Sequence, residues 1–390
     1  MVGQQTVRFA DVPILSLQAY KEGTPSDKTE FLSGLQKSWD SRYGGQGFGK
    51  FIDTGLDVSF TADMLRESRF FFENLNTSQK ERYNLHCRGQ RGYTGFGVEG
   101  AKDRAIGDLK EILMWGRDGI PGEPTNIHPF EVPGLRGVSM YAYERIEEDN
   151  RILYKAVAEI LDVDPRYFDW DWQNGRKPNS GLRSLYYPAV EQDLIERLQR
   201  ESGTNDMPVR AAEHADINRA TWLYLGESSE GLQIKQGDGS WDDVCVSKEF
   251  AIVNVGDLLC TETDGILPSA IHRVLVTQSA MPRYSFPCFT HPAKEKYLRR
   301  IVTHPQNPGK VYRNAMIEVY GKEVFDLLHP EIQENLGLGR LRIVYDHFLE
   351  RRLADIGLFN DDHDLKRKVL REFENRLPRL AEPEEWEIAT

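Results

Sequence analysis

The feature that most restricts the fold is a run of short, strand-like segments between residues 182 and 289. Each is rich in β-branched and aromatic residues and is separated from the next by Gly, Asp or Ser, which is typical of β-strands joined by turns. The predicted strands are Leu182–Tyr187, Thr221–Leu225, Leu232–Lys235, Phe250–Val255, Arg273–Thr277 and Tyr284–Phe289. Strands this short at this spacing predict a barrel or sandwich such as a jelly roll.

The segments on either side of this region are predicted to be mainly helical. Apolar residues at helical spacing predict helices over residues 27–41, 58–76 and 137–162, with short strands at 12–17 and 51–53. After Lys294 the chain is helical and highly charged. We therefore expect an α+β fold with a mainly β core and three regions. Residues 1–165 are helical with a few strands that join the core, residues 166–292 form the jelly roll, and residues 293–390 are a helical extension that serves as a lid or a dimer contact.

The charge balance excludes some classes of partner. The formal net charge is −12, from 49 basic and 61 acidic residues, and an acidic chain repels nucleic-acid phosphates. No apolar run approaches the roughly 18 residues that span a membrane, and the N-terminus lacks the pattern of a secretory signal. The four cysteines form no C-x-x-C pair. We expect a cytoplasmic protein with a small-molecule partner, without nucleic acid or membrane, as a monomer or homodimer.

Three residues form a candidate metal site. His214 and Asp216 are two positions apart, and on a strand that spacing places both side chains on the same face. His272, 56 residues after Asp216, is the candidate third ligand. Two histidines and one carboxylate on one face of an ion leave the opposite face open. That arrangement suits iron(II) in reactions with dioxygen.

A second motif follows eleven residues after His272. Arg283 and Ser285 are again two positions apart, and we expect them on a strand next to the metal strand, facing the interior. A guanidinium and a hydroxyl together bind a carboxylate well. Each motif alone is weak, because H-x-D occurs often by chance and a single histidine is more often part of a core. The complete order, H-x-D, then H, then R-x-S within a strand-rich region, is far more specific.

Further segments carry a resemblance to a known family. They are Val12-Pro13-Ile14, Arg91-Gly92-Tyr93, Asp108-Leu109-Lys110-Glu111, Tyr186-Tyr187-Pro188, Asn254-Val255-Gly256-Asp257 and His272-Arg273-Val274. Over most of residues 10–292 the chain resembles the isopenicillin N synthase-like branch of the 2-oxoglutarate/iron(II)-dependent dioxygenases. The resemblance implies a double-stranded β-helix, which is a distorted jelly roll with the metal inside.

The resemblance also implies an activity and a role for each site residue. His214, Asp216 and His272 would be the iron ligands, Arg283 and Ser285 would bind the distal carboxylate of 2-oxoglutarate, and Tyr187 would assist at the co-substrate. The implied cofactors are Fe(II), 2-oxoglutarate and O2. The implied reaction oxidises an unactivated C–H bond of a small molecule, by hydroxylation, desaturation or ring closure, with release of succinate and CO2.

The chain departs from the family pattern at several points. Leu185 stands where many relatives have asparagine, and Ile217-Asn218-Arg219 follows the metal aspartate in place of the usual residues. Arg219 is either a solvated or salt-bridged strand residue or a contact to an anionic substrate. About 100 residues follow the R-x-S strand. A helix at Tyr345–Gly357 resembles the one that often closes chains of this family, and residues 300–340 would then be an insertion.

The substrate is predicted only by residue type. Candidate pocket residues are Arg91, Tyr93, Phe96, Arg219 and Phe289. Arginines and aromatic side chains favour a small polar or amphipathic substrate, such as a modified amino acid or a secondary metabolite.

Two alternative functions stay open at this point. One is an isopenicillin N synthase-like oxidase that needs no 2-oxoglutarate. The other is a non-catalytic barrel that binds a metal or ligand, against which the open triad argues, since structural metal sites tend to close their coordination. Hydrolysis is disfavoured because the chain has neither G-x-S-x-G nor H-E-x-x-H.

Overall fold

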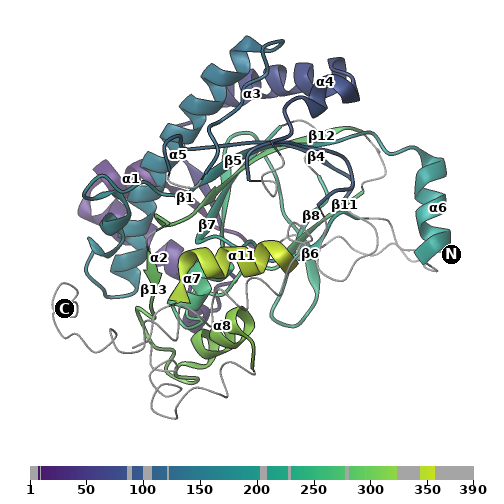
Figure 1. Cartoon of the computed structure of the whole chain (residues 1–390). Helices are drawn as coiled ribbons and strands as arrows, with labels where there is room; N and C mark the ends of the chain where they lie inside the picture. Colours follow the sequence, from purple (N-terminus) through teal and green to yellow (C-terminus); the bar gives the residue numbers. More distant parts are fainter. Residues whose placement is uncertain are drawn as a thin grey trace.

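The computed structural model describes most of the chain around a layered β core (Figure 1). The described residues are residue 8 and ranges 10–85, 90–99, 108–120, 123–202, 209–226, 230–276, 281–294, 296–322 and 343–355. Among them, no helix is both long and apolar enough to cross a membrane.

Two sheets form the core. The larger has eight strands in the order β1-β2-β10-β7-β12-β5-β4-β3, and the smaller has four in the order β6-β11-β8-β9. In the larger sheet the strands are β1 Ile14–Ser16, β2 Phe48–Ile52, β3 Gly92–Thr94, β4 Glu111–Gly116, β5 Gly181–Tyr187, β7 Ala220–Leu225, β10 Ala251–Val255 and β12 Arg283–Thr290. In the smaller sheet they are β6 Val209–His214, β8 Leu232–Lys235, β9 Trp241–Asp243 and β11 His272–Leu275. Residues of both sheets line one cavity, which therefore lies inside a double-stranded β-helix.

Helices from the first part of the chain cover one face of the larger sheet (Figure 1). They are α1 Leu17–Glu22, α2 Pro25–Trp39, α3 Val58–Arg69, α4 Thr77–Glu81 and α5 Pro133–Ile160. Apolar side chains of α2 and α5, including Trp39 and Leu153, join Phe51 and Trp222 of the sheet in one buried core. The helices thus bury the outer face of the sheet and leave its inner face for the cavity.

Local sequence explains where the second helix starts and how the third ends. Thr24 and Asp27 form a reciprocal capping box before α2, and Pro25 occupies the first helical turn, where its missing N–H costs nothing. The single helix predicted over residues 58–76 is instead α3 followed by one π-helical turn, Phe70–Asn74, that buries Phe71 and Phe72.

Helix α7 and the last described elements of the chain lie against the barrel. They are α7 Asp257–Glu262, β13 Tyr297–Leu298, α8 Lys310–Tyr320, β14 Ile343–Val344 and α11 Tyr345–Asp355. Helix α11, yellow in Figure 1, runs across the front of the barrel, and its Leu349 and Leu353 line the cavity. The predicted closing helix is therefore present to residue 355, and its last two predicted residues lie outside the described chain.

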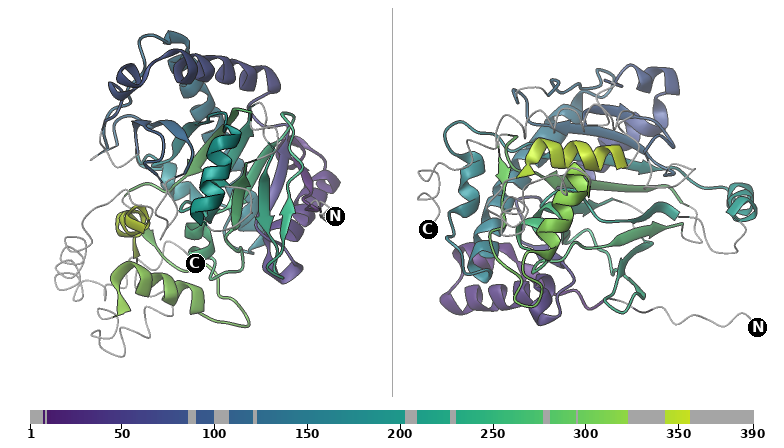
Figure 2. Two further views of the ribbon diagram at one scale, coloured as in Figure 1. Left: turned by 90° about the vertical axis from the view of Figure 1, so that its right-hand side faces the viewer. Right: turned by 60° about the horizontal axis from the view of Figure 1, so that its bottom comes forward.

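All six strands predicted in the central region are present, whereas four elements there were not predicted. They are strands β6 and β9, helix α7 and helix α6 Gln192–Ser202, of which α6 projects away from the barrel (Figure 2). Before this region, Gly92–Thr94 forms β3, which pairs with β4.

Candidate metal centre and its cavity

Two histidines face each other across neighbouring strands of the smaller sheet. His214 is the last residue of β6 and His272 is the first of β11, and the two are cross-strand partners. Their ring centroids are 4.3 Å apart. The Nδ1 atom of His214 lies 2.7 Å from the carbonyl oxygen of Ala212, and that of His272 lies 2.9 Å from the carbonyl oxygen of Ala270. A carbonyl only accepts, so each Nδ1 donates its hydrogen and each Nε2 keeps a free lone pair.

Asp216 completes the cluster from a turn, not from a strand. The expected alternation along a strand does not apply, because β6 ends at His214 and Asp216 lies two residues beyond it. The Asp257 N–H donates to the Asp216 carbonyl at 2.7 Å and fixes the turn. One carboxylate oxygen, Oδ2, accepts from Thr221 at 2.6 Å and from Asn254 at 2.8 Å. The other, Oδ1, lies 3.7 Å from Nε2 of His214 and 4.0 Å from Nε2 of His272.

The electrostatics keep His214 and Asp216 in their metal-binding forms. Burial and the neighbouring His272 lower the pKa of His214 to about 4, so its imidazole is neutral at neutral pH. Burial alone would raise the pKa of Asp216, but the two histidines and the hydrogen bonds to Oδ2 hold it below its ordinary value. One ligand atom from each residue lies within 4.8 Å of the others. Two neutral imidazoles and one carboxylate are the donor set of a facial iron site.

The arginine and serine of the second motif face this cluster from the other sheet. We expected them on a strand next to the metal strand, but β12 pairs with β5 and β7 in the larger sheet, across the cavity from β11. The Arg283 Nη1 donates to Ser285 Oγ at 3.1 Å, and the guanidinium lies 4.9 Å from the ring centroid of Tyr187. All three residues line the cavity, as does Leu185, the cross-strand partner of Ser285.

The environment of Arg283 fits an anionic ligand. The side chain is almost completely buried, and its Nε has no hydrogen-bond partner among the described residues. Burial lowers the pKa of Arg283 because it disfavours the charged form. A buried, incompletely paired guanidinium is costly unless an anion compensates it, so the site fits a carboxylate such as the distal one of 2-oxoglutarate.

Four charged residues form a network at another part of the cavity lining. Glu99 accepts from Arg183 Nη1 at 3.0 Å and lies 3.0 Å from Lys110 Nζ, which also pairs with Asp108 at 2.9 Å. Burial alone would raise the pKa of Glu99, but Arg183 and Lys110 lower it to about 2. The two carboxylates balance the two cations, so the network offers hydrogen bonds without a net charge.

Of the five predicted substrate residues, the structure brings only Phe289 to the cavity. Its ring lies 5.0 Å from the guanidinium carbon of Arg183. Tyr93 is buried and donates to Glu111 at 2.6 Å, whereas Phe96 is 47% exposed. Arg91 is also buried, and its Nη1 donates to the Gln90 carbonyl at 2.6 Å.

Arg219 is a salt-bridged residue and not part of the cavity lining. Its guanidinium is fully buried between Asp171 and Glu262, each at 2.6 Å. These carboxylates raise its pKa well above the ordinary value, although burial acts in the opposite direction. The first of the two expectations for this residue is therefore the one that the structure supports.

Several lining residues were missed by the sequence analysis. They are Glu99, Lys110, Arg183, His291, Leu349 and Leu353. Lys110 lies inside a segment that the family resemblance picked out, and that segment was the one available signal. The others come from separate parts of the chain, and only the three-dimensional fold places them together.

Comparisons with known proteins agree with this geometry. Residues 178–292 match the family model described as 2OG-Fe(II) oxygenase superfamily, and residues 12–133 match that described as non-haem dioxygenase in morphine synthesis N-terminal. The 2-oxoglutarate-dependent dioxygenase caaD of Aspergillus niger is 26% identical over 316 residues, which cover 78% of this chain and 89% of that protein.

Solved structures have the same fold. A Caulobacter crescentus protein described as a member of the 2OG-Fe(II) oxygenase family is 27% identical with a TM-score of 0.66, covering 89% of this chain and 99% of that one. A full-length Neurospora crassa protein solved with alpha-KG and thymine is 24% identical with a TM-score of 0.66, covering 88% and 96%.

Proposed function

The chain belongs to the 2OG-Fe(II) oxygenase superfamily, and we propose that His214, Asp216 and His272 hold its iron. The enzyme is a 2-oxoglutarate-dependent non-haem iron dioxygenase that uses Fe(II), 2-oxoglutarate and O2. The observation that carries the ligand assignment is the pair of Nδ1–H bonds to main-chain carbonyls, which turn both Nε2 lone pairs toward Asp216. Together, the iron, the keto acid and O2 supply oxidation of an unactivated C–H bond, with release of succinate and CO2.

We propose that the residues of the larger sheet bind and orient the co-substrate. Arg283 and Ser285 would bind its distal carboxylate, with the Tyr187 hydroxyl as a further donor at the cavity wall. Because these residues face the metal ligands from the opposite sheet, a ligand bound to both would lie across the barrel. The isopenicillin N synthase-like alternative is not favoured, since the relatives reported above are described as 2-oxoglutarate-dependent or were solved with alpha-KG.

The substrate that we propose is a small polar or amphipathic molecule, such as a modified amino acid or a secondary metabolite. The balanced network of Glu99, Asp108, Lys110 and Arg183 supports a substrate that forms several hydrogen bonds. Phe289 supports a substrate with an apolar or planar part. The Neurospora crassa relative was solved with thymine, which is itself a small polar molecule. Whether the reaction is hydroxylation, desaturation or ring closure stays a prediction.

We further propose that the region after residue 292 acts as a lid. Leu349 and Leu353 of α11 support this role, because apolar side chains over the cavity keep water away from the reacting groups. A reducing compartment such as the cytoplasm is supported by the free thiols of Cys245, Cys260 and Cys288.

Anaerobic titration tests the assignment. The protein would receive Fe(II) with and without 2-oxoglutarate, and we expect the weak visible charge-transfer band of iron-chelated keto acid. His214→Ala should abolish the band and Arg283→Ala should weaken it, whereas His304→Ala, at a histidine outside the cavity lining, should leave it unchanged. Bound iron without a band would contradict the use of 2-oxoglutarate. A wild-type protein that binds no iron would overturn the ligand assignment.

A further inference from the structure

Buried arginines in this fold differ in how their charge is compensated. Among the described residues, Arg210, Arg219 and Arg283 are each exposed by 1% or less. Arg219 lies between two carboxylates. A buried cation without such a partner costs several kcal/mol, so an uncompensated one indicates that its counterion is a ligand.

Arg210 and Arg283 have only neutral hydrogen-bond partners in the described chain. The Arg210 Nη2 donates to the main-chain carbonyl of Met281, and the Arg283 Nη1 donates to the hydroxyl of Ser285. The Nε atoms of both arginines have no partner there, and no described carboxylate lies within ion-pair distance of either guanidinium. The charge of Glu230 acts on both guanidiniums, but Glu230 forms no hydrogen bond or ion pair with either. Two positive charges are therefore buried without a directly paired anion from the described part of the protein.

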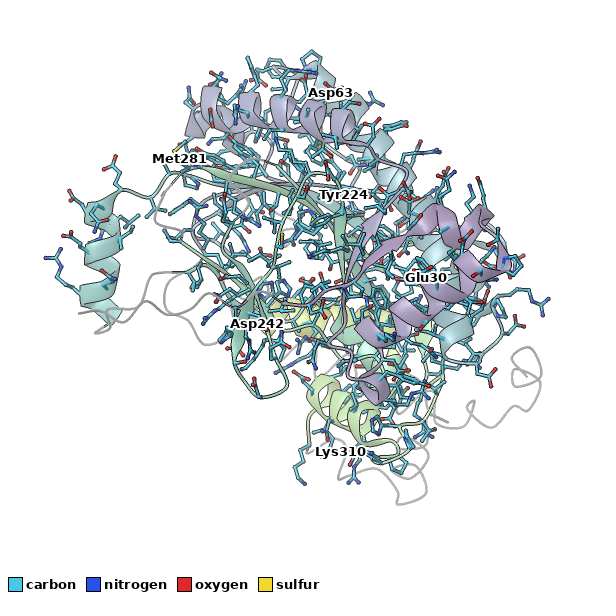
Figure 3. All side chains as sticks on the ribbon, turned by 180° about the vertical axis from the view of Figure 1, so that it is seen from behind. Glu30, Asp63, Tyr224, Asp242, Met281 and Lys310 are labelled. Atoms are coloured by element: carbon cyan, nitrogen blue, oxygen red, sulfur yellow. The ribbon has the colours of Figure 1, made fainter. Side chains whose placement is uncertain are left out.

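The position of Arg210 connects it to the proposed co-substrate site. It lies on β6 of the smaller sheet, four residues before His214, whereas Met281 lies two residues before Arg283, at the start of β12 in the larger sheet. The bond from Arg210 to Met281 thus joins the two sheets beside Arg283. Figure 3 shows Met281 at the edge of the barrel on the side from which α6 projects, and Tyr224 further inside.

Arg210 remains charged in this setting. Burial, followed by the positive charge of Arg283, lowers its pKa to about 10, which still leaves it protonated at neutral pH. Because each of the two guanidiniums disfavours the charge of the other, an anion that binds beside Arg283 relieves both.

We propose that Arg210 is a positioning and specificity-determining residue for the co-substrate, which holds the start of β12 and adds a second positive charge that favours a dianionic keto acid over a monoanionic one. The inference rests on the proposed function, because it assigns the anion to 2-oxoglutarate. Arg210 lies on the sheet opposite Arg283 and Ser285. It acts on the site indirectly, through its bond to Met281 and its charge near Arg283.

Binding measurements on the Mn(II)-loaded protein test the inference without turnover. Calorimetric titrations would compare 2-oxoglutarate with 2-oxopentanoate, which has the same keto-acid end and no distal carboxylate. We expect Arg210→Met to weaken 2-oxoglutarate binding about tenfold and to change 2-oxopentanoate binding less than about twofold. A tenfold change is the effect expected from one charge–charge interaction over several ångströms in a partly buried site. Arg210→Lys keeps the charge and should restore most of the lost affinity. Lys235→Met removes one half-buried charge, paired with Glu213, from the same sheet and should change neither binding constant.

The results distinguish a selective role of Arg210 in co-substrate binding from a purely structural role. Equal weakening of both keto acids by Arg210→Met would show a merely structural role and overturn the inference, as would no change in either. If Arg210→Met does not fold, Arg210→Lys still tests the inference. Lysine lacks the planar guanidinium that bonds the Met281 carbonyl, so this variant should bind 2-oxoglutarate modestly more weakly and 2-oxopentanoate as before. If the wild-type protein with Mn(II) binds 2-oxopentanoate as tightly as 2-oxoglutarate, the distal carboxylate contributes no affinity. That result would overturn the inference while leaving the metal site intact. Failure to bind either keto acid would overturn the proposed function itself.

Discussion

At the scale of single residues, hydrogen bonds from the protein orient each of the proposed metal ligands. Each histidine is oriented by the carbonyl two residues before it, and Asp216 is oriented by two donors on the oxygen that faces away from the histidines. Outer hydrogen bonds of this kind fix the direction of a ligand's lone pair and lower the cost of binding an ion. The affinity of the site should therefore depend on residues that never touch the metal.

Asn254 provides a test of that dependence. Asn254→Ala removes one of the two donors to Asp216 Oδ2 and frees the carboxylate to rotate, so we expect Mn(II) or Fe(II) affinity to fall about tenfold or more. Metal titration followed by calorimetry measures the change. Asn126→Ala, which removes an amide bonded to the Gly116 backbone, is the matched control. Unchanged affinity in Asn254→Ala would show that Thr221 alone orients the carboxylate.

A second residue gives a pH-dependent prediction. Asp149 of α5 is buried and accepts from the Gly55 N–H at 2.7 Å. Burial, followed by the neighbouring charge of Glu148, raises its pKa from 3.8 to about 6. The folded state therefore binds this proton more tightly than the unfolded state. The stability that the protonated carboxyl contributes is fully present below about pH 4 and is lost as pH rises through 6.

Asp149→Asn keeps the shape and the acceptor without the charge. We expect the variant to exceed the wild type in free energy of unfolding by on the order of 2 kcal/mol at pH 8, and the difference to shrink toward zero near pH 4. Urea unfolding at both pH values measures it. Asp63→Asn, at a half-exposed site on α3, controls for the loss of one carboxylate from a helix. A constant difference at all pH values would contradict the assigned pKa.

At the scale of elements, helix α11 is attached to the loop that carries Asp216. Arg352 forms ion pairs with Asp257 and, at 2.8 Å, with Glu318 of α8. The backbone N–H of Asp257 donates to the Asp216 carbonyl. A helix whose Leu349 and Leu353 line the cavity is therefore connected to the metal turn through one residue, Asp257.

Arg352→Met should loosen α11 without removing its apolar contacts. The change leaves the carboxylates of Asp257 and Glu318 without their shared cation, so we expect faster hydrogen–deuterium exchange in the amides of α11. Lys310→Met, at an exposed position on α8, controls for the loss of one positive charge. Exchange at the wild-type rate would show that Phe348, Leu349 and Leu353 hold the helix by themselves.

The strands and their pairing show which parts of the structure could be predicted from the sequence and which could not. The six central strands and the order H-x-D, H, R-x-S were readable because alternation and motif spacing are local properties. The sheet to which a strand belongs is not local, which is why β12 was placed beside the metal strand instead of across from it. Strand β6 has few β-branched residues, and Asp216 reaches the cluster through a turn that alternation does not describe. Arg210 gave no signal at all, because its importance comes from burial beside Arg283.

At the scale of the whole molecule, the two sheets carry complementary halves of one site. The smaller sheet and its turn supply His214, Asp216 and His272, whereas the larger supplies Tyr187, Arg283 and Ser285. The helices α2 and α5 bury the outer face of the larger sheet and fix its position. A ligand that binds both halves must therefore also stabilise the packing of one sheet against the other.

This arrangement predicts that metal and co-substrate stabilise the fold cooperatively. A ligand that binds only the folded state at about 100 times its dissociation constant adds about 2.7 kcal/mol to the free energy of unfolding. We expect Mn(II) alone to raise the melting temperature, 2-oxoglutarate alone to raise it little, and the two together to raise it by more than the sum. The reason is that, in the proposed function, one keto acid would bind both the metal on one sheet and Arg283 on the other. Removal of the metal with a chelator should abolish both effects, and His272→Ala should reproduce the chelated state. Additive shifts in differential scanning calorimetry would mean that the two ligands bind independently, and the proposal that one keto acid joins the two halves of the site would then fail.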